Sequence, residues 1–167
     1  GLAGAGRGGV PQRCDARGTG GTTGASLRFH ASADAVREQW AIWWRYWRWH
    51  GIPLHQRCGY FVGIDVVPAR AGAPYWRVNR PRGQHMFSIF HMRPETLPLY
   101  RDELDRLALP WLHGYPSVLA ILAAHLIESG TRLQAPPRWV TTGAESLLPH
   151  QVEIGRASCR ERVCHRV

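Results

Sequence analysis

Glycines and threonines alternate in one segment near the front of the chain, which reads Thr19-Gly20-Gly21-Thr22-Thr23-Gly24-Ala25-Ser26. Because glycine has no Cβ, successive backbone N–H groups in such a loop can converge on phosphate oxygens, and threonine hydroxyls can donate further hydrogen bonds. The spacing matches neither a Walker loop nor the Gly-x-Gly-x-x-Gly fingerprint of dinucleotide-binding folds. The segment therefore predicts a phosphate-binding loop without lysine, with a plain flexible turn as the alternative.

Two later segments join this loop in a recognisable order. One reads His113-Gly114-Tyr115-Pro116-Ser117 at the start of an expected helix, and the other runs T-T-G-A-E-S-L-L-P-H-Q from Thr141 after an expected strand. With T-G-G-T-T-G-A-S-L-R-F before them, the chain resembles the adenylate-forming ligases of the phenylacetate-CoA ligase and capsular-polysaccharide-biosynthesis (CapK-like) type. The likeness runs from about Gly18 to Glu153 and includes Y-W-R-V-N-R at Tyr75–Arg80.

The resemblance implies a reaction. An enzyme of this type uses ATP and Mg²⁺ to convert a small carboxylic acid into an acyl adenylate, and then passes the acyl group to coenzyme A or another acceptor. The reaction brings a carboxylate and a phosphate together, so the protein must shield negative charge and hold both reactants in line. The expected partners are a carboxylic acid and a nucleotide.

The resemblance also implies site residues. Gly143, Ala144 and Glu145 match the segment that lies along the adenine; the alternative is an ordinary strand-to-helix turn with Glu145 in the first turn of the next helix. The pyrophosphate would be clamped by Thr19, Gly20, Gly21, Thr22, Thr23 and Gly24. The acyl pocket would include His113, Tyr115 and Pro116, which are equally compatible with a helix start packed in the core.

Several parts of the family pattern are missing. The family loop often ends in Pro or is followed by Lys, where this chain has Ala25, Ser26 and Leu27. No Tyr-Gly-x-Thr/Ser-Glu motif for Mg²⁺ follows Glu145, and no lysine occurs anywhere among the 167 residues. We therefore assign no catalytic residue and expect a fragment that lacks the small C-terminal domain and does not catalyse adenylation.

The hydrophobic pattern predicts an α/β fold, a partial N-terminal domain with a mostly parallel sheet and flanking helices. Strands and helices alternate along the chain, so sites are expected at the carboxyl ends of the strands. Ser32 is the expected N-cap of the first helix, and Gly51 its stop. The predicted helices span 33–50, 94–107 and 116–130, and the predicted strands span 58–67, 84–92, 108–113 and 138–142.

The expected organisation has three parts. Residues 1–17 are rich in Gly and Arg without periodicity and are expected to be loop or disorder. Residues 18–153 form the fragment of the AMP-binding domain. Residues 154–167 resemble a translated sequencing adapter and are excluded from the fold prediction.

Composition limits the function classes. All 21 basic residues are arginine, and residues 154–167 carry four of them against one glutamate, so the formal net charge of +9 falls to +6 without that segment. This charge is spread thinly and does not indicate a nucleic-acid surface. Cys14 and Cys58 form no Cys-x-x-Cys pair, and the chain has neither an apolar run for a membrane span nor a signal peptide, so we expect a cytoplasmic protein.

Eight tryptophans raise one competing class. The helix at 33–50 interleaves aromatic and basic residues, as a small Arg/Trp-rich module that binds nucleic acid or a membrane surface would. Its periodicity favours a core face, however, made of Trp40, Trp43, Trp44 and Trp47, with only Tyr46 and Trp49 exposed. The nine histidines show no metal-ligand spacing, so no metal site is predicted.

Overall fold

The computed structural model describes residues 14–18, 28–158 and 163–164. The chain divides after Gly51 into two compact units. The expected phosphate loop, Thr19–Gly24, lies outside the described residues, and so do residues 1–13.

The first unit contains a two-stranded ribbon and one helix. Strands β1 (Cys14–Gly18) and β2 (Arg28–Ser32) pair antiparallel, with Cys14 opposite Ser32. Helix α1 (Ala33–Trp49) follows at once, and the Ser32 side chain accepts a hydrogen bond from Ala35 N at 3.2 Å. The predicted helix and its N-cap are confirmed, whereas the end of the segment expected to be loop contains β1.

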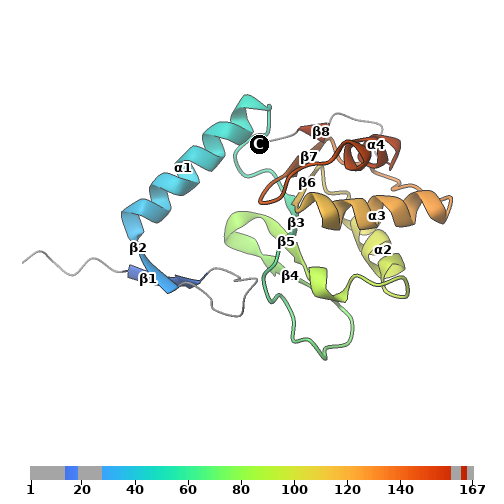
Figure 1. Ribbon diagram of the computed structural model, residues 1–167, viewed down its shortest axis with the longest axis horizontal. Helices are drawn as coiled ribbons and strands as arrows, with labels where there is room; N and C mark the ends of the chain where they lie inside the picture. The colour runs from blue at the N-terminus through green and yellow to red at the C-terminus, as the bar shows by residue number, and fades with distance from the viewer. Residues whose placement is uncertain (1–13, 19–27, 159–162, 165–167) are drawn as a thin grey trace, which may run out of the picture. The chain divides into compact units, whose positions relative to one another are not determined.

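The second unit is built on a six-stranded sheet in the order β4-β5-β3-β6-β7-β8 (Figure 1). Four of its five strand pairs are parallel, and only β4 pairs antiparallel with its neighbour, β5. The predicted α/β class with a mostly parallel sheet is confirmed. The strands are β3 (Cys58–Phe61), β4 (Trp76–Asn79), β5 (Gln84–Phe87), β6 (Trp111–Gly114), β7 (Trp139–Thr142) and β8 (Val163–Cys164).

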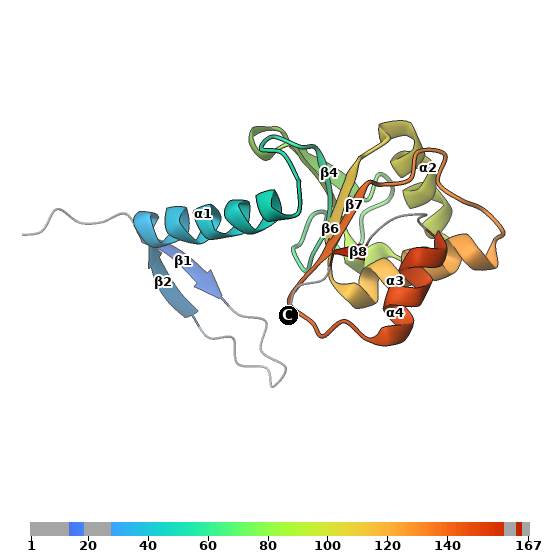
Figure 2. The same cartoon turned by 90° about the horizontal axis from the view of Figure 1, so that it is seen from above.

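The core lies between the sheet and its helices. Phe61, Phe87 and Leu112 from three strands pack with apolar residues of the helices, and the Phe61 and Phe87 rings stack at 4.6 Å. Helices α3 and α4 lie side by side against the sheet (Figure 2). The helices are α2 (Leu97–Leu107), α3 (Pro116–Glu128) and α4 (Pro149–Ser158), with short 3-10 turns at Arg80–Arg82 and Ile89–His91.

Several boundaries differ from the prediction. The strands predicted at 58–67 and 84–92 end at Phe61 and Phe87, and the helix predicted from Pro94 begins at Leu97. The strand predicted at 108–113 begins only at Trp111, because Ala108 takes a left-handed conformation (φ 47°) that ends α2. Local backbone conformation decided these ends, and apolar pattern cannot reveal it.

The tryptophan-bearing face of α1 that was predicted to lie in the core is less buried than expected. Only Trp47 is buried, whereas Trp40, Trp43 and Trp44 are half-buried and Trp49 is 76% exposed. The Trp44 and Trp47 rings meet edge to face at 4.9 Å. The rings of Trp40 and Trp43 also contact Trp47, at 6.4 Å and 5.7 Å, so three neighbouring indoles on the same helix pack against it.

The last part of the chain takes part in the described fold. Helix α4 crosses residue 154, and β8, inside the segment set aside as adapter-like, pairs parallel with β7. The proposed division at residues 153 and 154 remains a prediction. Among the described residues, no helix is long and apolar enough to cross a membrane.

Candidate active site

Two of the predicted motifs meet at one end of the sheet. Strands β6 and β7 are parallel neighbours, with His113 opposite Thr141 and Gly114 opposite Thr142. Just beyond the strand ends, Gly143 N donates to Gly114 O at 3.3 Å. The H-G-Y-P-S and T-T-G-A-E segments therefore leave the sheet side by side at its carboxyl edge, where α/β folds bind ligands.

Gly114 permits this close approach. A Cβ at this position would lie 2.6 Å from Phe61 O of the adjacent strand β3. Only glycine fits without a backbone shift, which explains the glycine of the H-G-Y-P-S segment as a packing requirement.

Glu145 connects the two motifs directly. Its Oε2 accepts a hydrogen bond from Ser117 N at 3.1 Å, in the first turn of α3. Tyr115 is the N-cap of that helix and provides no side-chain cap, so a carboxylate from 28 residues downstream satisfies one of its free N–H groups. The alternative that placed Glu145 in the next helix is wrong, because α4 begins at Pro149.

The backbone at the predicted adenine segment is unusual. Ala144 has a φ of +66°, a left-handed conformation that residues with a Cβ seldom adopt. Gly143 and Ala144 therefore form a sharp turn with little side-chain bulk between β7 and Glu145. Such a turn can present a flat backbone surface to a ring.

His113 faces a different side of the sheet from the core helices. Its Nδ1 lies 2.8 Å from Thr141 Oγ1, which also accepts from Trp111 Nε1 at 2.8 Å. Its ring stacks on Tyr60 at 5.1 Å. Burial lowers the pKa of His113 to about 4, although its contact with Thr141 opposes the shift, so the imidazole is neutral at pH 7.

Tyr115 and Pro116 follow His113 but occupy separate environments. Tyr115 N donates to Phe61 O at 3.2 Å, and its hydroxyl lies 3.1 Å from the position that a Cβ on Gly63 would take. Pro116 is buried and lines an apolar cavity. The three residues predicted for one acyl pocket thus point in different directions, and only Pro116 reaches this cavity.

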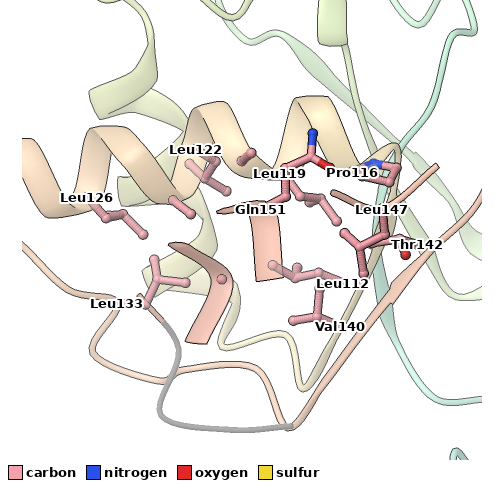
Figure 3. A pocket seen from close by; sticks show the side chains of 13 residues that line it. Leu112, Pro116, Leu119, Leu122, Leu126, Leu133, Val140, Thr142, Leu147 and Gln151 are labelled. Carbon is pink, nitrogen blue, oxygen red and sulfur yellow. The ribbon is translucent and has the colours of Figure 1, made fainter. Parts of the chain in front are cut away.

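The cavity lies between α3, α4 and strands β6 and β7 (Figure 3). Leu112, Val140 and Thr142 line it from the strands, and Ala123 lines it from α3. None of these residues is among the site residues predicted from the sequence, although Thr142 belongs to the T-T-G-A-E segment. The signal was present in the small residues of an almost entirely apolar helix, because alanines facing a sheet leave space that larger side chains would fill.

The described residues contain no group of three or more His, Cys, Asp or Glu side chains that could hold a metal ion. We therefore assign no set of protein ligands to Mg²⁺.

Comparison with known proteins agrees with this arrangement. No protein-family model matches the chain. Over 131 residues the chain is 28% identical to Protein CapK of Staphylococcus aureus, a stretch that covers 78% of this chain and 29% of CapK. The chain is thus similar in sequence to part of CapK. The resemblance predicted from the three motifs is confirmed at this level.

The fold of the chain is similar to that of a solved protein, the N-terminal domain of FACL13 from Mycobacterium tuberculosis, crystallised with an inhibitor. The TM-score is 0.53 at 15% identity, over 91% of this chain and 35% of the FACL13 chain. The chain thus spans about a third of the length of either protein. At this identity the FACL13 match concerns the fold alone.

Proposed function

We propose that the chain is part of an ATP-dependent ligase that activates a carboxylic acid as an acyl adenylate and transfers the acyl group to coenzyme A or another acceptor. One observation carries the proposal: the H-G-Y-P-S and T-T-G-A-E segments converge at the carboxyl edge of the sheet, where Glu145 binds Ser117 N at 3.1 Å. The similarity to CapK supports the same assignment.

The proposed roles follow from the chemistry of each segment. The turn at Gly143 and Ala144 offers a flat backbone on which an adenine ring can stack, and its carbonyls can accept from the adenine amino group. Thr19–Gly24 would bind the phosphates through backbone N–H groups and hydroxyls, as the sequence predicts. Bound Mg²⁺ would neutralise phosphate charge during attack by the carboxylate.

The neutral His113 fits a position next to such a site. An uncharged imidazole carries no positive charge that would compete with bound Mg²⁺ for the phosphate oxygens. The contacts of His113 with Thr141 and Tyr60 fix the orientation of its ring. We propose that His113 shapes the site from the sheet face opposite the cavity and does not line the acyl pocket itself.

The test separates binding from catalysis. We expect the 167-residue chain to bind ATP weakly in calorimetry and to show no ATP–pyrophosphate exchange above background, because it has no lysine. The matched variants are Thr23→Ala, which removes a loop hydroxyl, and Thr131→Ala, which removes a hydroxyl remote from both motifs. ATP binding should weaken only in Thr23→Ala.

Two other results would each contradict one expectation. Exchange activity by this chain would refute the expected inactivity while supporting the ligase assignment. Salt-sensitive binding of single-stranded nucleic acid that ATP does not displace would instead favour the Arg/Trp-rich binding module, since each phosphate contact releases counterions.

A further inference from the structure

The apolar cavity is lined mostly by aliphatic side chains. Leu126 and Leu133 lie at one end, and Pro116, Thr142 and Leu147 lie at the other (Figure 3). The second end adjoins both converging motifs, because Pro116 opens α3 and Thr142 directly precedes the Gly143–Glu145 turn. A molecule in the cavity would thus have one end against hydrocarbon and the other next to the predicted nucleotide site.

Thr142 supplies one polar atom at that second end. Its side chain is 5% exposed, and its Oγ1 has no hydrogen-bond partner among the described residues. Gln151 is the other polar side chain that lines the cavity, and its Oε1 already accepts from Leu148 N at 2.9 Å. A buried hydroxyl without a partner costs free energy, so the Thr142 hydroxyl is the group left to bind a polar atom of a ligand.

The size of the cavity limits the apolar part of that ligand. Its volume is about 40 Å³. An apolar cavity that holds benzene is about 150 Å³, whereas a single water needs only about 10–15 Å³. The space therefore suits a few aliphatic carbons and excludes an aromatic ring unless the core expands, which close packing resists.

We propose that the cavity binds the hydrocarbon chain of a short aliphatic carboxylic acid, and that the Thr142 hydroxyl donates a hydrogen bond to a carboxylate oxygen of this acid. This inference rests on the proposed ligase function and specifies its substrate class. It places the carboxylate between the cavity and the Gly143–Glu145 turn, on the side from which the free acid would meet the nucleotide before adenylation.

The test is a chemical-shift titration of the ¹⁵N-labelled 167-residue chain with butyrate and with phenylacetate, without nucleotide. Butyrate should shift the amides of Leu122, Ala123 and Thr142 in a saturable manner, and phenylacetate should not. Thr142→Val removes only the hydroxyl and should weaken butyrate binding on the order of tenfold. Thr142→Ser keeps the hydroxyl and should bind within a few-fold of the parent chain.

A second variant tests the cavity without touching its polar atom. Ala123→Val partly fills the space and should abolish the butyrate shifts while the fold is retained. Equal binding of phenylacetate and butyrate, or unchanged butyrate binding by Thr142→Val, would overturn the inference. ATP binding in the absence of butyrate binding would refute only this inference, whereas butyrate binding by a chain that does not bind ATP would refute the proposed function.

Discussion

At the scale of single residues, the site depends on a few atoms with specific neighbours. Gly114 allows β3 and β6 to approach, and Glu145 caps a helix that begins 28 residues earlier. The sequence indicated a role for Glu145 by its place in a motif. Its partner, Ser117 N, depends on the tertiary structure, because the parallel pairing of β6 and β7 brings the two segments together.

Removal of the Glu145 carboxylate should destabilise the start of α3. We expect Glu145→Ala to lower the free energy of unfolding by about 0.5–1 kcal/mol, the cost of losing an exposed helix cap, as measured by urea denaturation. Glu145→Gln keeps an acceptor oxygen and loses only the charge, so its stability should lie between that of the parent chain and that of Glu145→Ala. If both variants matched the parent chain, the hydrogen bond to Ser117 N would contribute nothing in solution.

At the scale of elements, helix starts are where sequence and structure agree best. Ser32 caps α1 and Pro116 occupies the first turn of α3, both as predicted, because these residue types act through their immediate backbone. Strand ends were predicted less well. Apolar residues continue past Phe61 and Phe87 into irregular segments without strand pairing, where Val67 is buried but Ile64 and Phe90 are exposed.

The Ser32 cap provides a test on the first unit alone. Ser32→Ala should reduce the local stability of α1 by about 1 kcal/mol, because Ala35 N loses its side-chain acceptor. Amide hydrogen exchange within Ala33–Trp49 measures this effect. Ser32→Asp retains an acceptor and should restore protection, so loss of protection in both variants would exclude the cap as the cause.

At the scale of the whole molecule, the second unit buries ionisable groups on both faces of its sheet. On one face, Glu103 Oε1 lies 3.0 Å from His85 Nε2 and 2.6 Å from the Arg106 guanidinium. The His85 pair is within ion-pair distance but outside hydrogen-bond geometry. Burial lowers the pKa of His85 despite the Glu103 carboxylate, and His113 on the other face shows the same direction.

These two histidines predict destabilisation in acid. A folded-state pKa below the ordinary value means that the unfolded chain binds protons more readily, so stability falls as the pH drops below about 6.5. For His113, with a pKa of about 4, the loss is on the order of 3 kcal/mol by pH 4. Denaturant midpoints measured between pH 7 and 4 should show this slope.

His113→Asn keeps a polar atom near Thr141 and cannot titrate in this range, so it should flatten the pH dependence substantially. His85→Asn should flatten it further in combination. A parent chain equally stable at pH 7 and pH 4.5 would contradict the buried, neutral state of His113.

The sequence by itself determined the α/β class, the CapK-like resemblance, the starts of α1 and α3 and the segments that form the candidate site, because these depend on local residue chemistry and on order along the chain. Tertiary structure decided which segments meet. It separated His113 from Pro116 on opposite faces of the sheet and gave Glu145 its partner. It also left the Thr142 hydroxyl in an apolar cavity, because burial and register arise from packing between residues distant in the chain.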